Sequence, residues 1–182
     1  MIHLIIGGAR SGKSRYALEQ AQALSQSKNC GVTFVATATG LDDEMLARIQ
    51  RHKEERPAHW KLAEVPLALS AFIQQVNQQT QQVLLIDCLT LWLNNQLFSA
   101  PEQDFQALFS ELIHTLTAST CDIFIVSNEV GLGVIPMGEI SRTFVDQAGW
   151  LNQAMAAAAD QVTFIAAGLP MTLKAKSSKG DN

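Results

Sequence analysis

The feature that most constrains this chain is the stretch GGARSGKS, from Gly7 to Ser14. It fits the pattern G-x-x-x-x-G-K-[ST], follows the apolar run IHLII, and opens an amphipathic segment that begins at Lys13. Glycines in these positions let the backbone bend until successive N–H groups point at phosphate oxygens, and the positive end of the following helix strengthens that attraction. A strand, a glycine loop and a helix in this order predict a nucleotide-binding site rather than an ordinary glycine-rich turn.

The rest of the chain repeats this alternation of short apolar runs with longer amphipathic segments. The runs are nearly continuous in apolar residues, as expected of parallel strands that are covered on both faces. Strands are predicted at IHLII, GVTFVAT, QVLLID, DIFIVSN and QVTFIAA. Helices are predicted over residues 13–25, 42–56, 66–79, 89–98, 101–117 and 139–159. The pattern predicts a single α/β domain with a mostly parallel sheet over residues 1–172, followed by a frayed polar tail over 173–182.

Composition narrows the class of protein. The 182 residues are 47% hydrophobic and 16% charged, which is enough apolar material for a buried core. The net charge is −4 and no basic patch stands out, which argues against nucleic-acid binding. No apolar run is long enough to span a bilayer, and the start of the chain does not resemble a signal peptide. Cys30, Cys88 and Cys121 fit no zinc or redox spacing, so we expect buried thiols and a cytoplasmic protein.

Three residues are candidates for handling phosphate charge. Lys13 should reach the β- and γ-phosphates, and Ser14 should ligate Mg²⁺. Asp87 ends the run VLLID, from where a carboxylate reaches the metal, although it could instead cap the following helix. The next residue is Cys88, where many NTP-hydrolysing motors carry a glutamate, and the chain has no N-K-x-D motif for reading guanine. These features favour group transfer to an acceptor over a motor or a GTPase switch.

The charged stretch LDDEMLARIQRHKEERPAHW predicts a helix that ends at Pro57. At about 100° per residue, His52 falls among the apolar positions, whereas most of the charged residues face the solvent. An inward histidine is either a structural residue or, as a neutral imidazole, a nucleophile able to attack phosphorus. Arg48 could then hold a phosphate, and Glu55 could fix the tautomer of the ring.

The position of this stretch favours the chemical role for His52. The strand GVTFVAT leads into it, which puts it at the carboxyl end of the sheet, where ligands bind in such folds. His59 is the second candidate for a nucleophile, and it lies beyond the proline that ends the helix.

Four segments of the chain together resemble the bifunctional adenosylcobinamide kinase / adenosylcobinamide-phosphate guanylyltransferase family of cobalamin biosynthesis. They are GGARSGKS, VATATGLDDEMLARIQRHKEERPAHW, LIDCLTLWLNN and SNEVGLGVIP. The first is common to phosphate-loop proteins, whereas the second and fourth are far more specific. The similarity extends from about Ile2 to Gly168, which is nearly the whole chain.

The resemblance implies a RecA-like P-loop NTPase fold, a homotrimer shaped like a pinwheel, and a corrinoid substrate. It implies that adenosylcobinamide is phosphorylated with ATP or GTP, and that GMP then moves from GTP to the new phosphate through a GMP-histidine. The histidine that matches is His52. Some members carry two adjacent histidines where this chain has Arg51 and His52. Only the second position faces inward, so we expect the covalent residue to be intact.

The resemblance also implies which residues contact the nucleotide. With His52 and Lys13 as the catalytic pair and Ser14 and Asp87 as Mg²⁺ ligands, the nucleotide contacts are Gly7, Gly8, Ala9, Arg10, Ser11, Gly12, Lys13, Ser14, Ala36, Thr37, Ala38, Lys53, Glu54, Glu55, Arg56, Glu64 and Asp87. Without the resemblance, Glu64 would be interpreted as a surface charge on the short strand WKLAEV.

Two further points remain open at this stage. Asn128 and Glu129 follow the strand DIFIVSN and precede a glycine-rich loop, which either shapes the acceptor site or is only structural. The alternatives in function are a phosphate-loop kinase for another small molecule, with a structural His52, and a non-catalytic nucleotide-binding regulator. A covalent GMP adduct would separate all three functions.

Overall fold

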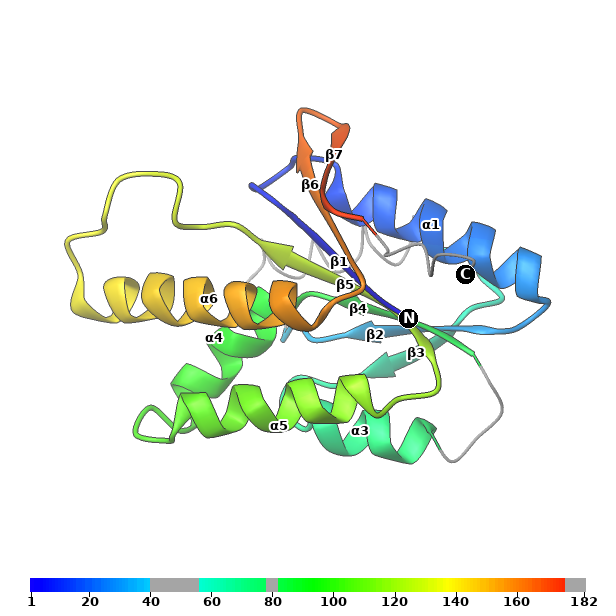
Figure 1. Cartoon of the computed structure of the whole chain (residues 1–182). Coiled ribbons are helices and arrows are strands. Elements are labelled where there is room, and N and C mark those ends of the chain that lie inside the picture. The colour runs from blue at the N-terminus through cyan, green and yellow to red at the C-terminus, as the bar shows by residue number, and fades with distance from the viewer. Residues whose placement is uncertain (40–55, 78–81, 176–182) are drawn as a thin grey trace, which may run out of the picture.

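A computed structural model describes residues 1–39, 56–77 and 82–175 of the chain. Its centre is a seven-stranded sheet with the order β3-β2-β4-β5-β1-β6-β7 (Figure 1). All neighbouring strands are parallel except β6 and β7, which are antiparallel. The strands are β1 (Ile2–Gly7), β2 (Val32–Ala36), β3 (Lys61–Glu64), β4 (Val83–Asp87), β5 (Asp122–Asn128), β6 (Gln161–Ala166) and β7 (Leu169–Lys174).

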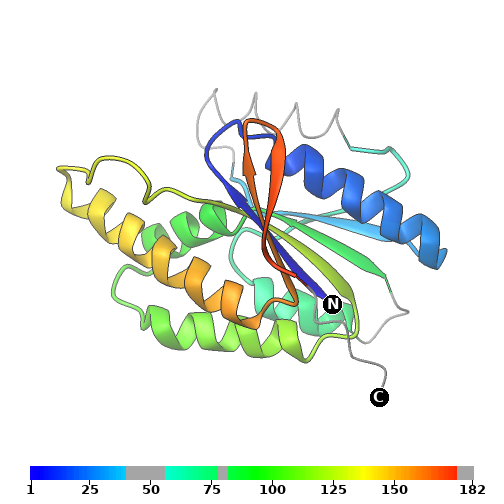
Figure 2. The same ribbon diagram turned by 45° about the horizontal axis from the view of Figure 1, so that its top comes forward.

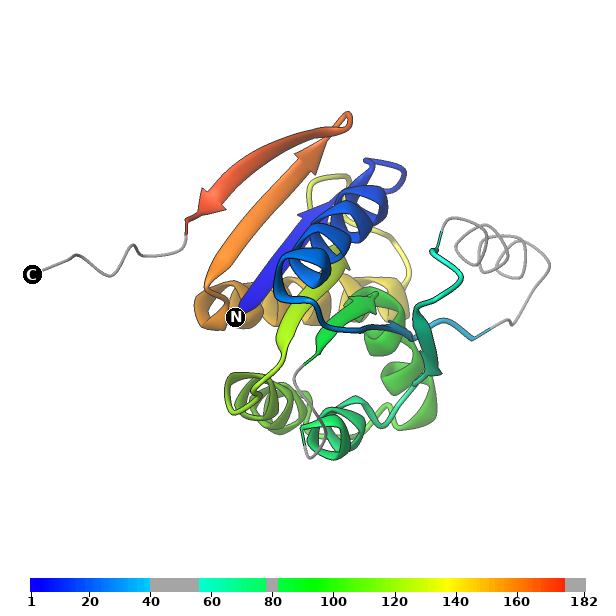
Figure 3. The same ribbon diagram turned by 90° about the vertical axis from the view of Figure 1, so that its right-hand side faces the viewer.

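Helices cover both faces of the sheet. The described helices are α1 (Lys13–Lys28), α3 (Leu69–Val76), α4 (Leu89–Ser99), α5 (Phe105–Thr117) and α6 (Glu139–Ala158). α1 lies on one face, and α3, α4, α5 and α6 lie on the other (Figure 1). The two edges of the sheet, β7 and β3, are far apart when the molecule is viewed from the side (Figure 3).

Two hydrophobic cores follow from the alternation of side chains along each strand. In β1, Leu4 packs on the side of the four helices and Ile5 packs on the side of α1, and both are fully buried. In β4, Leu84 and Leu85 divide in the same way. Because successive side chains of a strand point to opposite faces, a strand covered on both sides needs apolar residues throughout. This explains why the central strands appear in the sequence as continuous apolar runs.

The predicted elements agree with most of those observed. The α/β class and the five predicted strands are confirmed. α5 begins at Phe105 rather than at Pro101, because the carboxylate of Asp104 accepts a hydrogen bond from the amide of Ala107 at 3.0 Å and caps the helix there. The helix predicted over residues 42–56 lies outside the described residues except for Arg56.

β7 is a strand that the sequence analysis did not predict. It continues to Lys174, two residues into the tail that was predicted to begin at 173. Ala167 and Gly168 form the tight turn before it, with φ of 50° and 80°. Two left-handed residues in succession suit a two-residue hairpin, because their backbone twist matches that of the strands. Every residue of β7 is exposed, so no buried apolar run marks it in the sequence.

Two expectations about the chemistry of the chain can be compared with the structure. All three cysteines are free thiols, but Cys30 is only half-buried, whereas Cys88 and Cys121 are buried as expected. Among the helices of the described residues, none combines the length and the apolar character that crossing a membrane requires.

Candidate active site

The carboxyl ends of five neighbouring strands lie side by side along one border of the sheet, the carboxyl edge. Ala36, the last residue of β2, is paired with Glu64 of β3 on one side and with Asp87 of β4 on the other. Gly7, the last residue of β1, is paired with Asn128 of β5. This register brings together residues that are distant in the sequence, and the loop from Gly7 to Ser14 begins at the same edge.

The glycine loop is packed too tightly for side chains at two positions. A Cβ atom on Gly7 would lie 2.5 Å from the carbonyl oxygen of Ile165, which is closer than real Cβ atoms approach. Gly12 has a φ of 94°, and a Cβ atom there would lie 3.3 Å from the Cα of Gly168. The loop therefore needs glycine both for its conformation and for its contact with β6 and the β6–β7 turn.

The β6–β7 turn is a part of this site that the sequence analysis missed. It lies beside the loop between β1 and α1 (Figure 2), and the amide of Gly168 donates a hydrogen bond of 2.8 Å to the carbonyl of Ser11. The signal in the sequence is weak: a glycine after the run QVTFIAA, followed by exposed residues that alternate only briefly.

Lys13 is the first residue of α1 and is buried against the loop. Its ammonium group donates a hydrogen bond of 3.0 Å to the carbonyl of Gly8. Burial lowers the pKa of Lys13 below its ordinary value of 10.5, and the negative charge of Asp87 partly opposes that shift. The lysine thus couples the loop electrostatically to the end of β4, as a phosphate-binding cation should.

Asp87 ends β4 and is not the cap of the next helix. The capping position of α4 is Cys88, and no side chain makes a capping hydrogen bond there. Burial, followed by the charge of Asp87, raises the pKa of the Cys88 thiol to about 11. Cys88 is therefore neutral at ordinary pH and is no candidate for a nucleophile.

The donor set at this edge fits Mg²⁺. A hydroxyl from Ser14 and a carboxylate from Asp87 are hard oxygen ligands, the kind that Mg²⁺ prefers. Within the described ranges, no group of three or more His, Cys, Asp or Glu side chains gathers to form a complete metal cage. A magnesium ion bound by few protein ligands, with the remainder supplied by water and substrate phosphates, is the usual arrangement for nucleotide enzymes.

The other predicted nucleotide contacts lie partly within the described residues. Ala36 and Ala38 are half-buried at the end of β2, Thr37 between them is fully buried, and Glu64 is exposed at the end of β3. The guanidinium of Arg56 lies 5.6 Å from the centre of the Phe34 ring. His52 and its neighbours Lys53, Glu54 and Glu55, together with Arg48 and Arg51, lie outside the described residues.

His59 is in the wrong place for the nucleophile. It is exposed in the turn that precedes β3, in which the amide of Trp60 donates to the carbonyl of Pro57 at 3.1 Å. The first residue of β3, Lys61, is paired with Thr33 near the amino end of β2. His59 therefore lies toward the amino edge of the sheet, opposite to the phosphate loop.

The end of β5 is held firmly at the site. The amide of Asn128 donates to the hydroxyl of Thr90 at 2.7 Å, and its carbonyl accepts from the carboxamide of Asn152 at 3.1 Å. The next residue, Glu129, donates its amide to the carbonyl of Gly7 at 3.0 Å. These contacts fix the start of the loop that follows β5, immediately beside the phosphate loop.

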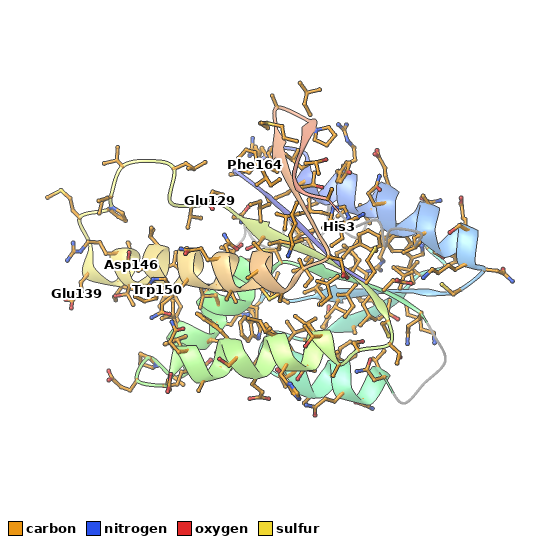
Figure 4. The ribbon with its side chains drawn as sticks, viewed as in Figure 1. His3, Glu129, Glu139, Asp146, Trp150 and Phe164 are labelled. Atoms are coloured by element: carbon orange, nitrogen blue, oxygen red, sulfur yellow. The ribbon has the colours of Figure 1, made fainter. Side chains whose placement is uncertain are left out.

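The loop that follows Glu129 projects outward from the rest of the protein. The carboxylate of Glu129 accepts a hydrogen bond from the amide of Gly131 at 2.8 Å. Beyond it, four large apolar side chains are at least 75% exposed: Leu132, Val134, Ile135 and Met137. Figure 4 shows Glu129 where the chain leaves β5, with Glu139 and Trp150 on α6 below the loop. An exposed apolar surface of this kind commonly marks a site of interaction.

A match to the model of a protein family shows to which family this chain belongs. The model described as "Cobinamide kinase / cobinamide phosphate guanyltransferase" matches residues 3–173. The chain belongs to this family. The protein is accordingly an enzyme with two activities, a cobinamide kinase and a cobinamide phosphate guanylyltransferase. The resemblance inferred from four sequence segments is thereby confirmed.

Curated relatives within the family cover the chain almost completely. The bifunctional adenosylcobalamin biosynthesis protein CobP of Pseudomonas aeruginosa is 47% identical over 174 residues, which is 96% of this chain and 98% of the relative. The bifunctional adenosylcobalamin biosynthesis protein CobU of Salmonella typhimurium is 38% identical over 187 residues, covering 96% of this chain and all of the relative.

Solved structures with low sequence identity show the same fold. The flagellar accessory protein FlaH from Methanocaldococcus jannaschii is 14% identical, with a TM-score of 0.58 over 99% of this chain and 80% of that chain. The ATPase domain of G40P is also 14% identical, with a TM-score of 0.52 over 90% of this chain and 68% of that chain. The fold is therefore the RecA-like P-loop NTPase fold that the resemblance implied.

Proposed function

We propose that both reactions of the family take place at the carboxyl edge of the sheet, with Lys13 and His52 as catalytic residues. The observation that carries this proposal is the buried ammonium of Lys13, which lies within the phosphate loop and is electrostatically coupled to Asp87. The substrates are adenosylcobinamide and a nucleotide. The nucleotide contacts are those that the resemblance implies, from the loop, the end of β2, residues 53–56, Glu64 and Asp87.

In the kinase reaction, the γ-phosphoryl group of ATP or GTP passes to the aminopropanol hydroxyl of adenosylcobinamide. Backbone N–H groups of the loop and the ammonium of Lys13 neutralise the charge that spreads over the transferring group. Ser14 and Asp87 would hold Mg²⁺, which supplies further positive charge to the phosphates when it is bound. Positioning and electrostatic stabilisation together account for most of the catalysis of phosphoryl transfer.

In the guanylyl reaction, a ring nitrogen of His52 attacks the α-phosphorus of GTP. A P–N bond forms, and the bond to the bridging oxygen breaks to release pyrophosphate. A phosphate oxygen of adenosylcobinamide phosphate then attacks the same phosphorus, the P–N bond breaks, and adenosylcobinamide-GDP is formed. Dividing the transfer into two displacements lets one site accept two bulky substrates in turn.

The acceptor is proposed to lie against the loop that follows β5. Support comes from the exposed apolar side chains of this loop, which begins beside Gly7, and from the exposed Ile140 at the start of α6. A corrinoid macrocycle is large and bears methyl groups that can contact apolar side chains. An open apolar loop next to the phosphate site would contact it without enclosing it.

A homotrimer in the cytoplasm is part of the same proposal. The resemblance implies the trimer, and Leu169, Met171 and Leu173 expose an apolar face of the edge strand β7 that a subunit contact would cover. The free thiols of the described cysteines agree with a reducing compartment. Light scattering of the full chain should give the mass of three subunits, and a monomer would contradict this part of the proposal.

The covalent adduct is the decisive test of the function. The protein is incubated with α-labelled GTP, and the label should be acid-labile and base-stable, with an intact mass increased by one GMP. His52→Ala should abolish the adduct and keep the kinase activity. His59→Ala is the matched control and should keep both. A label that persists in His52→Ala would exclude His52 as the nucleophile.

The same experiment separates the alternatives. A phosphate-loop kinase for another small molecule would form no adduct and would not turn over cobinamide. A nucleotide-binding regulator would bind GTP and transfer nothing to any acceptor.

A further inference from the structure

Thr37 follows β2 and is completely buried, with 0% of its surface exposed. Its hydroxyl accepts a hydrogen bond from the amide of Cys88 at 2.9 Å and donates one to the carbonyl of Cys88 at 2.7 Å. Its own amide donates to the carbonyl of Asp87 at 3.3 Å. The side-chain hydroxyl of Thr37 thus binds the backbone of Cys88, the residue that follows Asp87.

Asn95, on α4, binds the backbone of Thr37. Its carboxamide nitrogen donates to the carbonyl of Thr37 at 2.8 Å and to the carbonyl of Pro66 at 3.0 Å. Its carboxamide oxygen accepts a hydrogen bond from the hydroxyl of Thr39 at 3.2 Å. One nearly buried side chain therefore ties the segment that leaves β2 to the segment that leaves β3.

These contacts matter because the backbone after Asp87 is buried. The amide of Cys88 donates to the Thr37 hydroxyl, and the carbonyl of Cys88 accepts from that hydroxyl and from the amide of Trp92 at 3.1 Å. A buried amide that loses its acceptor is costly. A backbone that shifts to find new partners would carry the carboxylate of Asp87 with it. Loss of a group that orients a metal ligand typically weakens metal binding by about 10-fold to 100-fold.

We propose that Thr37 is a positioning residue for the carboxylate of Asp87, and that Asn95 holds Thr37 in place. This inference rests on the proposed role of Asp87 as a ligand of the nucleotide-bound metal. It deepens that role, because it explains how the ends of β2, β3 and β4 stay in one arrangement while two different acceptors are served.

Two variants of Thr37 are compared with a matched control. Thr37→Val removes the hydroxyl and keeps the shape, whereas Thr37→Ser keeps the hydroxyl. The control is Thr33→Val, at a buried threonine within β2 whose hydroxyl donates to the carboxamide oxygen of Gln82 at 2.7 Å. Thr33 lies near the amino end of β2, remote from the site. Removing its hydroxyl should therefore lower the free energy of unfolding without affecting the binding of the metal.

The measurement is the binding of Mn²⁺, detected by electron paramagnetic resonance, to the full chain with the α,β-methylene analogue of GTP. This analogue cannot transfer GMP, so binding is read without turnover. Thr37→Val should weaken Mn²⁺ binding about 10-fold to 100-fold, the usual effect of losing a group that orients a metal ligand. Thr37→Ser and Thr33→Val should bind Mn²⁺ as the unchanged protein does.

The variant Asp87→Asn distinguishes an error in the metal role of Asp87 from an error in the positioning role of Thr37. If Asp87→Asn weakens Mn²⁺ binding and Thr37→Val does not, the metal role of Asp87 stands and the positioning role of Thr37 is wrong. If neither change has an effect, both are wrong. If Thr37→Val does not fold, Asn95→Leu removes the support of Thr37 instead, and Mn²⁺ binding that is unchanged in a folded Asn95→Leu protein overturns the proposal.

Discussion

The amide of Gly168 donates a hydrogen bond of 2.8 Å to the carbonyl of Ser11, which joins the β6–β7 turn to the phosphate loop. The Cα of Gly168 would also lie 3.3 Å from a Cβ atom on Gly12, so the two backbones are nearly in contact. A loop that presents its amides to phosphate must keep a fixed shape, because a misplaced donor binds poorly. The antiparallel hairpin at the edge of the sheet therefore supports the site as well as the fold.

Gly168→Ala should weaken GTP binding and lower stability. The φ of Gly168 is 80°, and this left-handed conformation costs a residue with a Cβ roughly 1–2 kcal/mol. Space for the new atom is adequate, since its nearest neighbour is a guanidinium nitrogen of Arg15 at 3.8 Å. The loss should therefore come from strain in the turn that holds Ser11. Calorimetry with GTP and urea unfolding measure the two effects.

Gly31→Ala is the control for that experiment. Gly31 is remote from the loop, a Cβ atom there would meet nothing within 4 Å, and its φ does not require glycine. Both GTP affinity and stability should remain near those of the unchanged protein. Equal GTP affinity in the Gly168 and Gly31 variants would show that the turn does not support the loop.

Lys13→Ala should impair both reactions. The ammonium of Lys13 is the buried cation of the loop, and removing one preorganised donor from a transition state commonly lowers the rate on the order of 100-fold or more. Lys28→Ala is the matched control, because Lys28 ends the same helix and pairs with Asp122 at the amino edge of the sheet. Rates of adduct formation and of cobinamide phosphorylation provide the readout, and a normal rate of either reaction in Lys13→Ala would contradict a shared site.

His3 should make the protein less stable in acid. Its ring is buried between β1 and α1, and its Nε2 lies 2.8 Å from the hydroxyl of Thr163. Burial lowers the pKa of His3 below its ordinary value of 6.5. The unfolded chain therefore takes up the proton first. The stability due to neutral His3 is complete above pH 6.5, and it is lost as the pH falls toward and through the lowered folded pKa, by at most about 1.4 kcal/mol per pH unit.

Urea unfolding between about pH 7.5 and about pH 5 measures this dependence. His3→Gln keeps a hydrogen-bonding group but cannot titrate, so its stability should change less over this range. His59→Gln, which removes an exposed histidine, is the matched control. If the His3 and His59 variants show the same slope, the protonation of His3 does not limit stability in acid.

The sequence was sufficient for the parts of the site that follow strands with a strong apolar pattern. The phosphate loop after β1 and Asp87 at the end of β4 lie at the strand ends where the sequence predicted them, because residues at the carboxyl ends of parallel strands share an edge. Asn128 was expected at that edge for the same reason. Each of these residues is marked by the local pattern immediately before it, so no knowledge of distant contacts was needed.

The parts of the fold and of the site that the sequence did not predict depend on contacts between segments that are remote in the sequence. Asn95 resembles any polar residue of a helix, and only the folded chain shows its carboxamide between Thr37 and Pro66. Similarly, β7 is an exposed edge strand with no buried face, so periodicity could not reveal it. The turn at Gly168 gains its meaning from the loop against which it packs. Such contacts cannot be deduced from hydrophobic pattern, because their partners are not adjacent in the chain.

Glu129→Ala should weaken the use of cobinamide without affecting the GMP adduct. The carboxylate of Glu129 accepts a hydrogen bond from the amide of Gly131 and so shapes the beginning of the apolar loop. Without it, the loop should be less ordered where the acceptor is proposed to bind, and the KM for cobinamide should rise several-fold in both reactions. The adduct forms from GTP alone, so its rate should stay the same.

Glu139→Ala is the control, because it removes another carboxylate near this loop, from the first turn of α6. It should change neither the KM for cobinamide nor the rate of adduct formation, and it should lower the free energy of unfolding by about 0.3–1 kcal/mol. Unchanged cobinamide kinetics in both steps with Glu129→Ala would assign this loop a structural role only.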